Sequence, residues 1–442
     1  MEGAARQRTV EPGCFRFGRS PGRRLAGEIC GPSRDRVPFP ALARADRLRY
    51  TLGPGCRGKP AGCGRKRRQK SKPPVNTVLT SLAARVRELI RCSSSAAFLG
   101  TDEPAFDALA LELFRAQFEL NPAYRALVQA RGIRPDQVKL WREIPAVPAR
   151  AFKELELTSL PPAELDFVFW SSGTTGHERS RHFHSRESVA LYEASLRPWF
   201  AHHLLRADGP APRLLALTPP PEQAPHSSLV HMLDVVLREH FPQAAESFFG
   251  RAQPDGAWEL EFARLASAIG SAQEARQPVL LLGTAFSFVH WLDGLAEVGG
   301  RMPLLAGSRV METGGYKGRS RELPRAQLHA ALADVLGLAA GDIVTEYGMS
   351  ELSSQAYDAP DPRTGARHFR FPPWARALVV SPDSGREVAD GERGRLRLFD
   401  LANVWSVLAV QTEDVAIRRG DGFELLGRAA AAEPRGCSLM SA

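Results

Sequence analysis

The sequence predicts an α/β fold in which parallel-rich sheets are covered by helices. Short apolar runs of strand length alternate with amphipathic segments of helix length through much of the chain. Several of these runs pass directly into segments rich in glycine and hydroxyl side chains. Alternation of this kind is typical of sheets with helices packed on their faces.

The predicted elements follow from apolar periodicity and from helix-ending residues. Helices are expected over residues 77–91, 104–119, 123–131, 187–205, 228–241, 285–295 and 325–337. Strands are expected over 167–170, 213–218, 278–283, 308–313 and 343–347. From 376 to 428 the pattern changes to short strands with hairpin turns such as Gly420-Asp421-Gly422, which predicts a small β-rich end.

The formal charge of +9 resides in an N-terminal extension. Residues 1–74 contain 19 Lys/Arg and 5 Asp/Glu, a net of +14, whereas 75–442 contain 39 and 44, a net of −5. The extension has no sustained periodicity and is predicted to be disordered. We interpret it as an inert tail or as translated upstream sequence that is not native. A nucleic-acid- or membrane-contacting arm is the alternative, and deletion of residues 1–74 distinguishes these views.

The expected cellular location depends on the absence of long apolar runs from the sequence. No apolar run approaches the roughly 20 residues of a membrane-spanning helix, so we expect a soluble, cytoplasmic protein. Of six cysteines only Cys92 and Cys437 lie outside the extension, which does not suggest a disulfide framework. No nucleic-acid partner is expected of the mildly acidic body.

The strongest local signal is a phosphate-binding loop after the strand at 167–170. It consists of Ser171, Ser172, Gly173, Thr174, Thr175 and Gly176. Two glycines allow close backbone approach, and hydroxyl and N–H groups offer donors to phosphate oxygens. It is not a Walker A loop, because no Gly-Lys-Ser/Thr follows.

Three further motifs accompany the loop. Thr345-Glu346-Tyr347-Gly348-Met349-Ser350-Glu351 offers a ring to stack on a purine and a carboxylate, Glu351, to hold Mg²⁺. Glu312-Thr313-Gly314-Gly315 suits a flat base. Thr412-Glu413-Asp414, followed by Arg428, offers a carboxylate for ribose hydroxyls and a guanidinium for ribose and phosphate.

In this order the motifs resemble those of the adenylate-forming ligases, and within them the LuxE-type acyl-protein synthetases. The resemblance spans about 77–440 and includes Ser180-Arg181-His182-Phe183-His184, Gly314-Gly315-Tyr316-Lys317-Gly318 and the ending Glu433-Pro434-Arg435-Gly436-Cys437. It implies the large N-terminal domain of that fold over 75–442, with stacked mixed sheets and a Cys-containing tail at 429–442. The usual small C-terminal domain and its catalytic lysine are expected to be absent.

The resemblance also implies a reaction. ATP and Mg²⁺ would activate a long-chain fatty or other hydrophobic carboxylic acid as an acyl-adenylate. Ser171–Gly176, Gly314, Gly315, Tyr347, Gly348, Ser350, Asp414 and Arg428 would bind the nucleotide. Cys437 would accept the acyl group and pass it to an acyl reductase partner. The alternative in the same superfamily is an acyl-CoA ligase similar to phenylacetate-CoA ligase.

The histidines complete the expected site. His182 and His184 are expected to face opposite sides of a strand, one lining the acyl pocket and the other at the surface. His182 is the candidate catalytic residue of the two. His231 is expected to be a core or pocket-wall histidine, and Phe286, Phe288 and Trp291 to be core.

Overall fold

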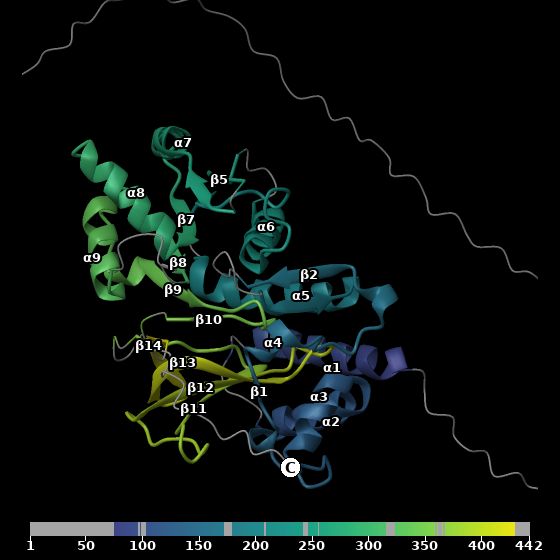
Figure 1. Ribbon diagram of the computed structural model, residues 1–442. Helices are drawn as coiled ribbons and strands as arrows, with labels where there is room; N and C mark the ends of the chain where they lie inside the picture. Colours follow the sequence, from purple (N-terminus) through teal and green to yellow (C-terminus); the bar gives the residue numbers. More distant parts are fainter. Residues whose placement is uncertain are drawn as a thin grey trace, which may run out of the picture. The chain divides into compact units, whose positions relative to one another are not determined.

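The architecture is described here from a computed structural model of the chain (Figure 1). The described residues are 75–95, 98, 103–171, 179–206, 209–241, 246–254, 256–314, 323–358, 360, 365 and 367–428. The predicted tail at 1–74 and the predicted Cys-containing tail at 429–442 therefore lie outside the described residues.

A five-stranded sheet carries most of the alternating strands. Its order is β10-β9-β8-β7-β4, with β4 (Arg213–Ala216), β7 (Val279–Thr284), β8 (Arg309–Thr313) and β9 (Ile343–Tyr347) parallel and β10 (Ala356–Tyr357) antiparallel. The parallel strands are buried on both faces, as parallel strands usually are. This sheet is the mixed, parallel-rich sheet that the alternating pattern predicts.

Helices cover both faces of this sheet (Figure 1). Leu214 and Leu280 point to a core shared with α5 (Arg186–Leu204) and α6 (Ser228–His240). Leu215 and Leu281 point to a second core, shared with α7 (Phe262–Glu274), α8 (Ala285–Glu297) and α9 (Arg325–Leu336). The one-residue alternation follows from the two-residue period of side chains along a strand.

The β-rich end forms a second five-stranded sheet. Its order is β1-β13-β12-β11, with β14 also paired to β13. The strands are β1 (Val147–Pro148), β11 (Ala375–Val380), β12 (Arg393–Asp400), β13 (Ala409–Arg419) and β14 (Gly422–Arg428). β1 pairs parallel with β13, so two residues from early in the chain complete this sheet.

Three N-terminal helices pack on the core of the second sheet: α1 (Val75–Ser95), α2 (Glu103–Leu120) and α3 (Pro122–Ala130). The Gln117 side chain of α2 is fully buried. Its amide donates to the carbonyls of Asn403 and Val404 at 2.8 and 3.2 Å, and its oxygen accepts from the amide of Leu408 at 2.9 Å. One side chain thus satisfies three backbone groups of the β12–β13 connection.

Short elements complete the fold. They are α4 (Ala151–Glu154), the strand pairs β2 (Phe167–Trp170) with β3 (Arg181–His184) and β5 (Gly250–Ala252) with β6 (Trp258–Leu260), and the 3₁₀ turns Trp141–Glu143, Pro162–Glu164 and Ala340–Asp342. Every predicted helix and strand is present, with ends shifted by a few residues. Strands β1, β5, β6 and β10 were not predicted, because two or three residues are too few to show a period. The short helix α4 and the longer helix α7 were also missed.

Gln117→Leu is predicted to lower the free energy of unfolding by about 2–4 kcal/mol, because the three backbone groups would stay buried without partners. Urea unfolding followed by circular dichroism measures the change. The matched control is Gln129→Leu, since Gln129 is an exposed glutamine on α3. Equal stability of the two variants would contradict this role for Gln117.

Candidate active site

Neighbouring parallel strands bring two of the predicted motifs together. Thr313 pairs with Glu346 at the ends of β8 and β9, so Gly314 and Tyr347 follow side by side. Gly314 has φ +74°, a conformation that favours glycine. Gly315 lies outside the described residues. The predicted base-binding segments therefore meet at one edge of the sheet.

A bulge in β13 presents Asp414 to that edge. Arg397 of β12 pairs with Gln411 and Arg395 pairs with Val415, so 412–414 lie opposite the single residue Leu396. Bulges re-aim side chains and leave backbone groups unpaired. Here the Thr412 hydroxyl donates to the Leu396 carbonyl at 2.8 Å and accepts from the Asp414 amide at 3.1 Å. The predicted Thr-Glu-Asp motif is this bulge.

Asp414 joins the two sheets. Its Oδ2 accepts the Tyr347 hydroxyl at 2.7 Å, and its Oδ1 lies 3.5 Å from Nε of Arg428, its cross-strand neighbour. Burial and the charge of Asp414 raise the pKa of Tyr347 well above its ordinary value, so the phenol stays a donor. Asp414 keeps unused lone pairs for further hydroxyl donors. The Arg428 side chain is 84% exposed and therefore accessible to a ligand.

Glu351 is a buried carboxylate without a cationic partner among the residues placed in the structure. Burial raises its pKa, while hydrogen bonds from the Ser180 and Ser350 hydroxyls and the charge of Arg428 act in the opposite direction. The Ser350 hydroxyl donates at 3.1 Å. A cation would relieve this burial cost, so the carboxylate fits a Mg²⁺ ion that takes its remaining ligands from phosphate and water.

The described residues contain no group of three or more His, Cys, Asp or Glu side chains that could hold a metal ion by themselves.

The base of the predicted phosphate loop lies beside Glu351. The Ser180 amide donates to the Ser171 hydroxyl at 2.9 Å, and the Ser171 amide donates to the Ser180 carbonyl at 3.1 Å. The Ser180 hydroxyl bonds to Glu351. Ser172–Gly176 themselves lie outside the described residues, as does Cys437.

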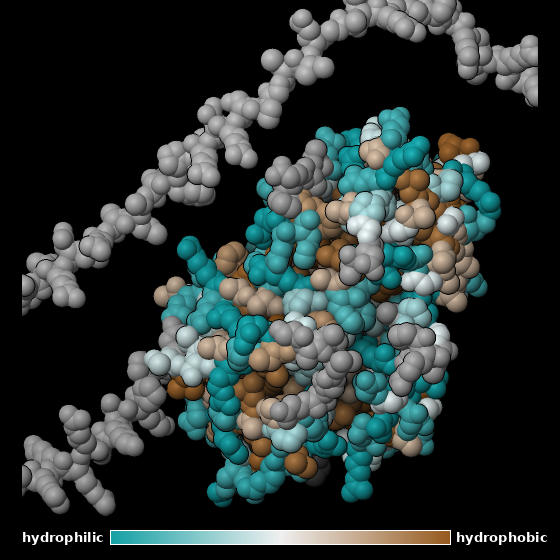
Figure 2. All heavy atoms as spheres, turned by 180° about the vertical axis from the view of Figure 1, so that it is seen from behind, coloured by the Kyte–Doolittle hydropathy of each residue, from teal (hydrophilic) through white to brown (hydrophobic). Residues whose placement is uncertain are grey.

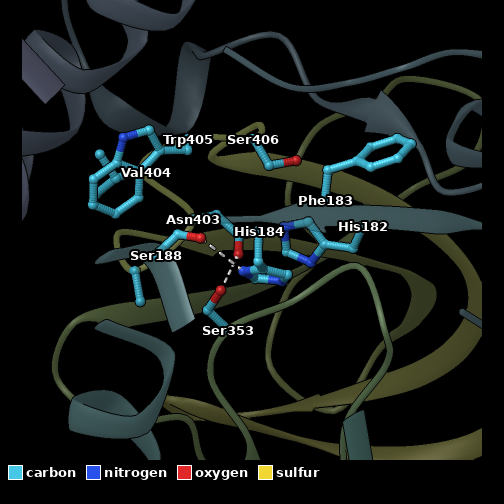
Figure 3. Close-up of a pocket in the computed structure, with 10 residues that line it drawn as sticks. His182, Phe183, His184, Ser188, Ser353, Asn403, Val404, Trp405 and Ser406 are labelled. Carbon is cyan, nitrogen blue, oxygen red and sulfur yellow. Dashed lines mark hydrogen bonds between the residues drawn. The ribbon is translucent and has the colours of Figure 1, made fainter. Parts of the chain in front are cut away.

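The prediction that His182 and His184 face opposite sides is wrong. Side chains two residues apart on a strand share one face. The two rings lie 4.2 Å apart, and both side chains are buried, so neither is a surface residue. Figure 3 shows both rings directed to the same small space beside Ser353 and Asn403, which is too small for a water molecule and cannot be an acyl pocket.

His182 nevertheless touches the site. Its Nδ1 donates to the Ser350 carbonyl at 2.8 Å, next to Glu351. Burial lowers the pKa of His182 to about 4, so the ring is neutral at pH 7. A neutral ring cannot supply positive charge to a phosphate. The geometry favours a positioning role, in which His182 fixes the Ser350-Glu351 segment.

Of the other aromatic predictions, those for His231, Phe288 and Trp291 agree with the structure, whereas the prediction that Phe286 is a core residue is wrong. His231 lies 3.2 Å from a Glu193 oxygen and packs against Phe169 and Tyr192, as a core or pocket-wall residue. Phe288 and Trp291 are buried in the second core, whereas Phe286 is half-buried and stacks on His290.

Sequence reasoning missed the buried carboxylate Glu346 as a structural part of the site. The Thr313 hydroxyl donates to it, which ties β8 to β9 next to Gly314. A Cβ at Gly348 would lie 2.3 Å from Glu346 Oε1, so a larger residue there would require the Glu346 carboxylate to move. The signal available was a carboxylate in a strand whose other residues are mostly apolar or aromatic.

Glu346 is predicted to make stability fall with rising pH. Burial, and then the neighbouring Glu312, raise its pKa from 4.5 to about 7 against the Thr313 hydrogen bond. The unfolded chain ionises this group near pH 4.5, whereas the folded chain keeps it protonated. Its stabilising contribution is complete below pH 4.5 and is lost up to about pH 7.

Between pH 5 and 7.5 the free energy of unfolding should fall less in Glu346→Gln than in the wild type. The difference between the two losses should be about 2 kcal/mol, as measured by urea unfolding. The exposed residue Glu297 gives the matched control, Glu297→Gln. Parallel pH profiles for Glu346→Gln and the wild type would contradict the prediction.

Comparison with solved structures defines the class of the fold. The chain is similar to 2-hydroxyisobutyryl-CoA ligase in complex with 2-HIB-AMP and CoA, with a TM-score of 0.52 and 15% identity over 73% of this chain and 74% of that one. A postadenylation-state structure of the same ligase gives a TM-score of 0.51 at 17% identity, over 73% and 67% of the two chains. The fold is that of the adenylate-forming ligases, as predicted.

The family follows from the sequence comparison. Residues 79–442 match the family described as "Acyl-protein synthetase, LuxE", and the chain belongs to it and is a ligase. Two relatives are named long-chain-fatty-acid–luciferin-component ligase. The one from Aliivibrio fischeri is 22% identical over 356 residues, 76% of this chain and 87% of its own length. The one from Vibrio harveyi is 21% identical over 345 residues, 74% and 84%.

Among the helices that the structure describes, none combines the length and apolar character needed to span a membrane.

Proposed function

We propose that this ligase uses ATP to convert a long-chain fatty acid, or another hydrophobic carboxylic acid, into an acyl-adenylate. The observation that carries the proposal is the meeting of Tyr347, Asp414 and Arg428 at one edge, with Glu351 at the base of the Ser/Thr/Gly loop. The family and the names of its relatives support the acid as substrate.

Activation is needed because a carboxylate is a poor electrophile. Attack of the acid oxygen on the α-phosphorus forms the acyl-phosphate bond and releases pyrophosphate. Negative charge grows on the phosphate oxygens, and donors already in place stabilise it without reorganisation. Mg²⁺, when bound, supplies positive charge at these oxygens.

The described residues divide this work. Asp414 accepts ribose hydroxyls, with the Tyr347 hydrogen bond holding its carboxylate in place. Arg428 bridges ribose and phosphate. Glu351 binds Mg²⁺, and neutral His182 fixes the backbone that carries Glu351. Gly314, Gly348 and Ser350 shape the nucleotide pocket.

Two substitutions separate the binding of ATP from the formation of the acyl-adenylate. Asp414→Asn should weaken ATP binding about tenfold or more with a smaller effect on the rate at saturation, since ribose contacts act on ground and transition states alike. Glu351→Gln should lower the rate of acyl-adenylate formation at saturating ATP, by about a hundredfold, because Mg²⁺ acts on developing charge.

Single-turnover quench assays measure both quantities. Asp383→Asn, in an exposed turn of the same sheet as Asp414, is the control and should behave as the wild type. If Asp414→Asn and Glu351→Gln also titrate with ATP and Mg²⁺ as the wild type does, the nucleotide site has been misassigned.

We propose further that Cys437 accepts the acyl group. Its thiolate attacks the acyl-adenylate carbonyl, a thioester forms and AMP leaves, which keeps the acyl group activated for an acyl reductase partner. Arg435 and Gly436 precede Cys437 in the sequence.

Incubation with ATP, Mg²⁺ and radiolabelled myristate should place one hydroxylamine-labile label on each chain. Cys437→Ser should lose this label while acyl-adenylate formation persists, and Cys92→Ser, which removes an exposed thiol, should retain it. Undiminished labelling of Cys437→Ser would overturn the assignment. Thioester formation that requires added CoA would favour the acyl-CoA ligase alternative.

A further inference from the structure

A second cavity lies away from the residues assigned to catalysis. It has a volume of about 390 Å³ and is lined by residues near α3, the turn Trp141–Glu143, β1, β12 and β13. Figure 1 shows α3, β1, β12 and β13 in the lower half of the fold. Its walls are apolar at Ile133, Ile144, Pro145, Ala146 and Pro148. This volume is within the range of small-molecule sites.

Two arginines meet in this cavity without an acidic partner. In the part of the chain that the structure describes, neither Arg131 nor Arg397 forms an ion pair with a carboxylate. They are close enough for the charge of Arg131, after burial itself, to lower the pKa of Arg397. Arg397 is half-buried and Arg131 is exposed, and an anion that contacts both would offset the repulsion between their like charges.

Both guanidinium groups are held in place. Nε of Arg397 donates to the Gln411 side-chain oxygen at 2.9 Å, and the Gln411 amide donates to the Leu396 carbonyl at 3.1 Å. Nη1 of Arg131 donates to the Ala146 carbonyl at 2.8 Å. No described residue accepts a hydrogen bond from the remaining N–H groups of either guanidinium, so these groups can bind an oxyanion.

The acidic residue of the cavity is already engaged. Oε2 of Glu143 accepts the backbone amides of Lys139 and Leu140 at 2.8 and 3.1 Å. It does not neutralise either arginine, so the lining has a net positive charge. An oxyanion therefore gains from the two arginines more than it loses to Glu143.

We propose that this cavity binds a small amphiphilic anion. Arg131 and Arg397 hold its oxyanion head, a phosphate or a carboxylate, and Ile133, Ile144 and Pro148 contact its apolar body. The site is separate from the edge formed by Tyr347 and Asp414. The Gln411 side chain connects the two regions, because it binds Arg397 and also caps the Leu396 carbonyl within the bulge that carries Asp414.

Titration calorimetry with the full chain tests the proposal, with octyl phosphate, decanoate and inorganic phosphate as probes. The wild type should bind octyl phosphate or decanoate, and the one that is bound more tightly identifies the head group. With decanoate, the wild type should bind one equivalent more than Arg397→Gln binds. This difference separates binding in this cavity from binding at a fatty-acid site elsewhere in the protein. Inorganic phosphate should bind at least about tenfold more weakly than octyl phosphate, because it makes no apolar contacts.

Arg131→Gln and Arg397→Gln should each weaken the binding at least about tenfold. The matched control is Arg134→Gln, since Arg134 is an exposed arginine of the same segment that pairs with Asp136. If Arg397→Gln does not fold, the comparison of Arg131→Gln with the wild type is the test. The Arg131 side chain is exposed, so its replacement should leave the fold intact. Absence of binding to the wild type, or equal binding to the wild type and both variants, would overturn the proposal.

Discussion

The hydrogen bond from Tyr347 to Asp414 is the contact on which the candidate site depends. It joins the end of a parallel strand to a bulge in the second sheet. A buried phenol must find an acceptor, and the high pKa of Tyr347 keeps its proton in place. Because the bulge places three residues opposite one, Asp414 leaves the regular strand pattern and reaches the ring.

The interior around this contact contains several carboxylates. Asp414 is half-buried, while Glu346 and Glu351 are buried, and burial raises the pKa of both glutamates. In the proposed reaction a polyphosphate approaches this acidic interior, which would be repulsive without cations. Glu351 suits Mg²⁺ for that reason, and Arg428 is exposed enough to move toward the nucleotide. Glu346 has a structural role instead, because it accepts the Thr313 hydroxyl and so links β8 to β9.

Much of the fold was predictable because it depends on local patterns. The helices at α5, α8 and α9 and the strands β7 to β9 are long or apolar enough to show a period. Gly314 and Tyr347 were both assigned to the nucleotide site from the sequence, and the pairing of β8 with β9 brings them to one edge of the sheet.

The rest of the fold and of the site depends on contacts between residues that are far apart in the sequence. The bulge at 412–414 appears only when β12 and β13 are in register, and β1 is too short to have a pattern. His182 and His184 were placed on opposite faces, although strand geometry alone puts them on one face. The burial of Glu346 and its link to Thr313 involve two strands that are 33 residues apart at this contact, which no single segment reveals.

The most direct test of the account is ATP–pyrophosphate exchange with acetate, phenylacetate, octanoate and myristate as acids. Reversible adenylation returns labelled pyrophosphate to ATP only when the acid is a substrate. We expect exchange that requires Mg²⁺, is strongest with the long-chain acid and is absent without acid. Failure of every acid to support exchange, in a folded protein that binds ATP, would contradict the proposal that this chain activates carboxylic acids by adenylation.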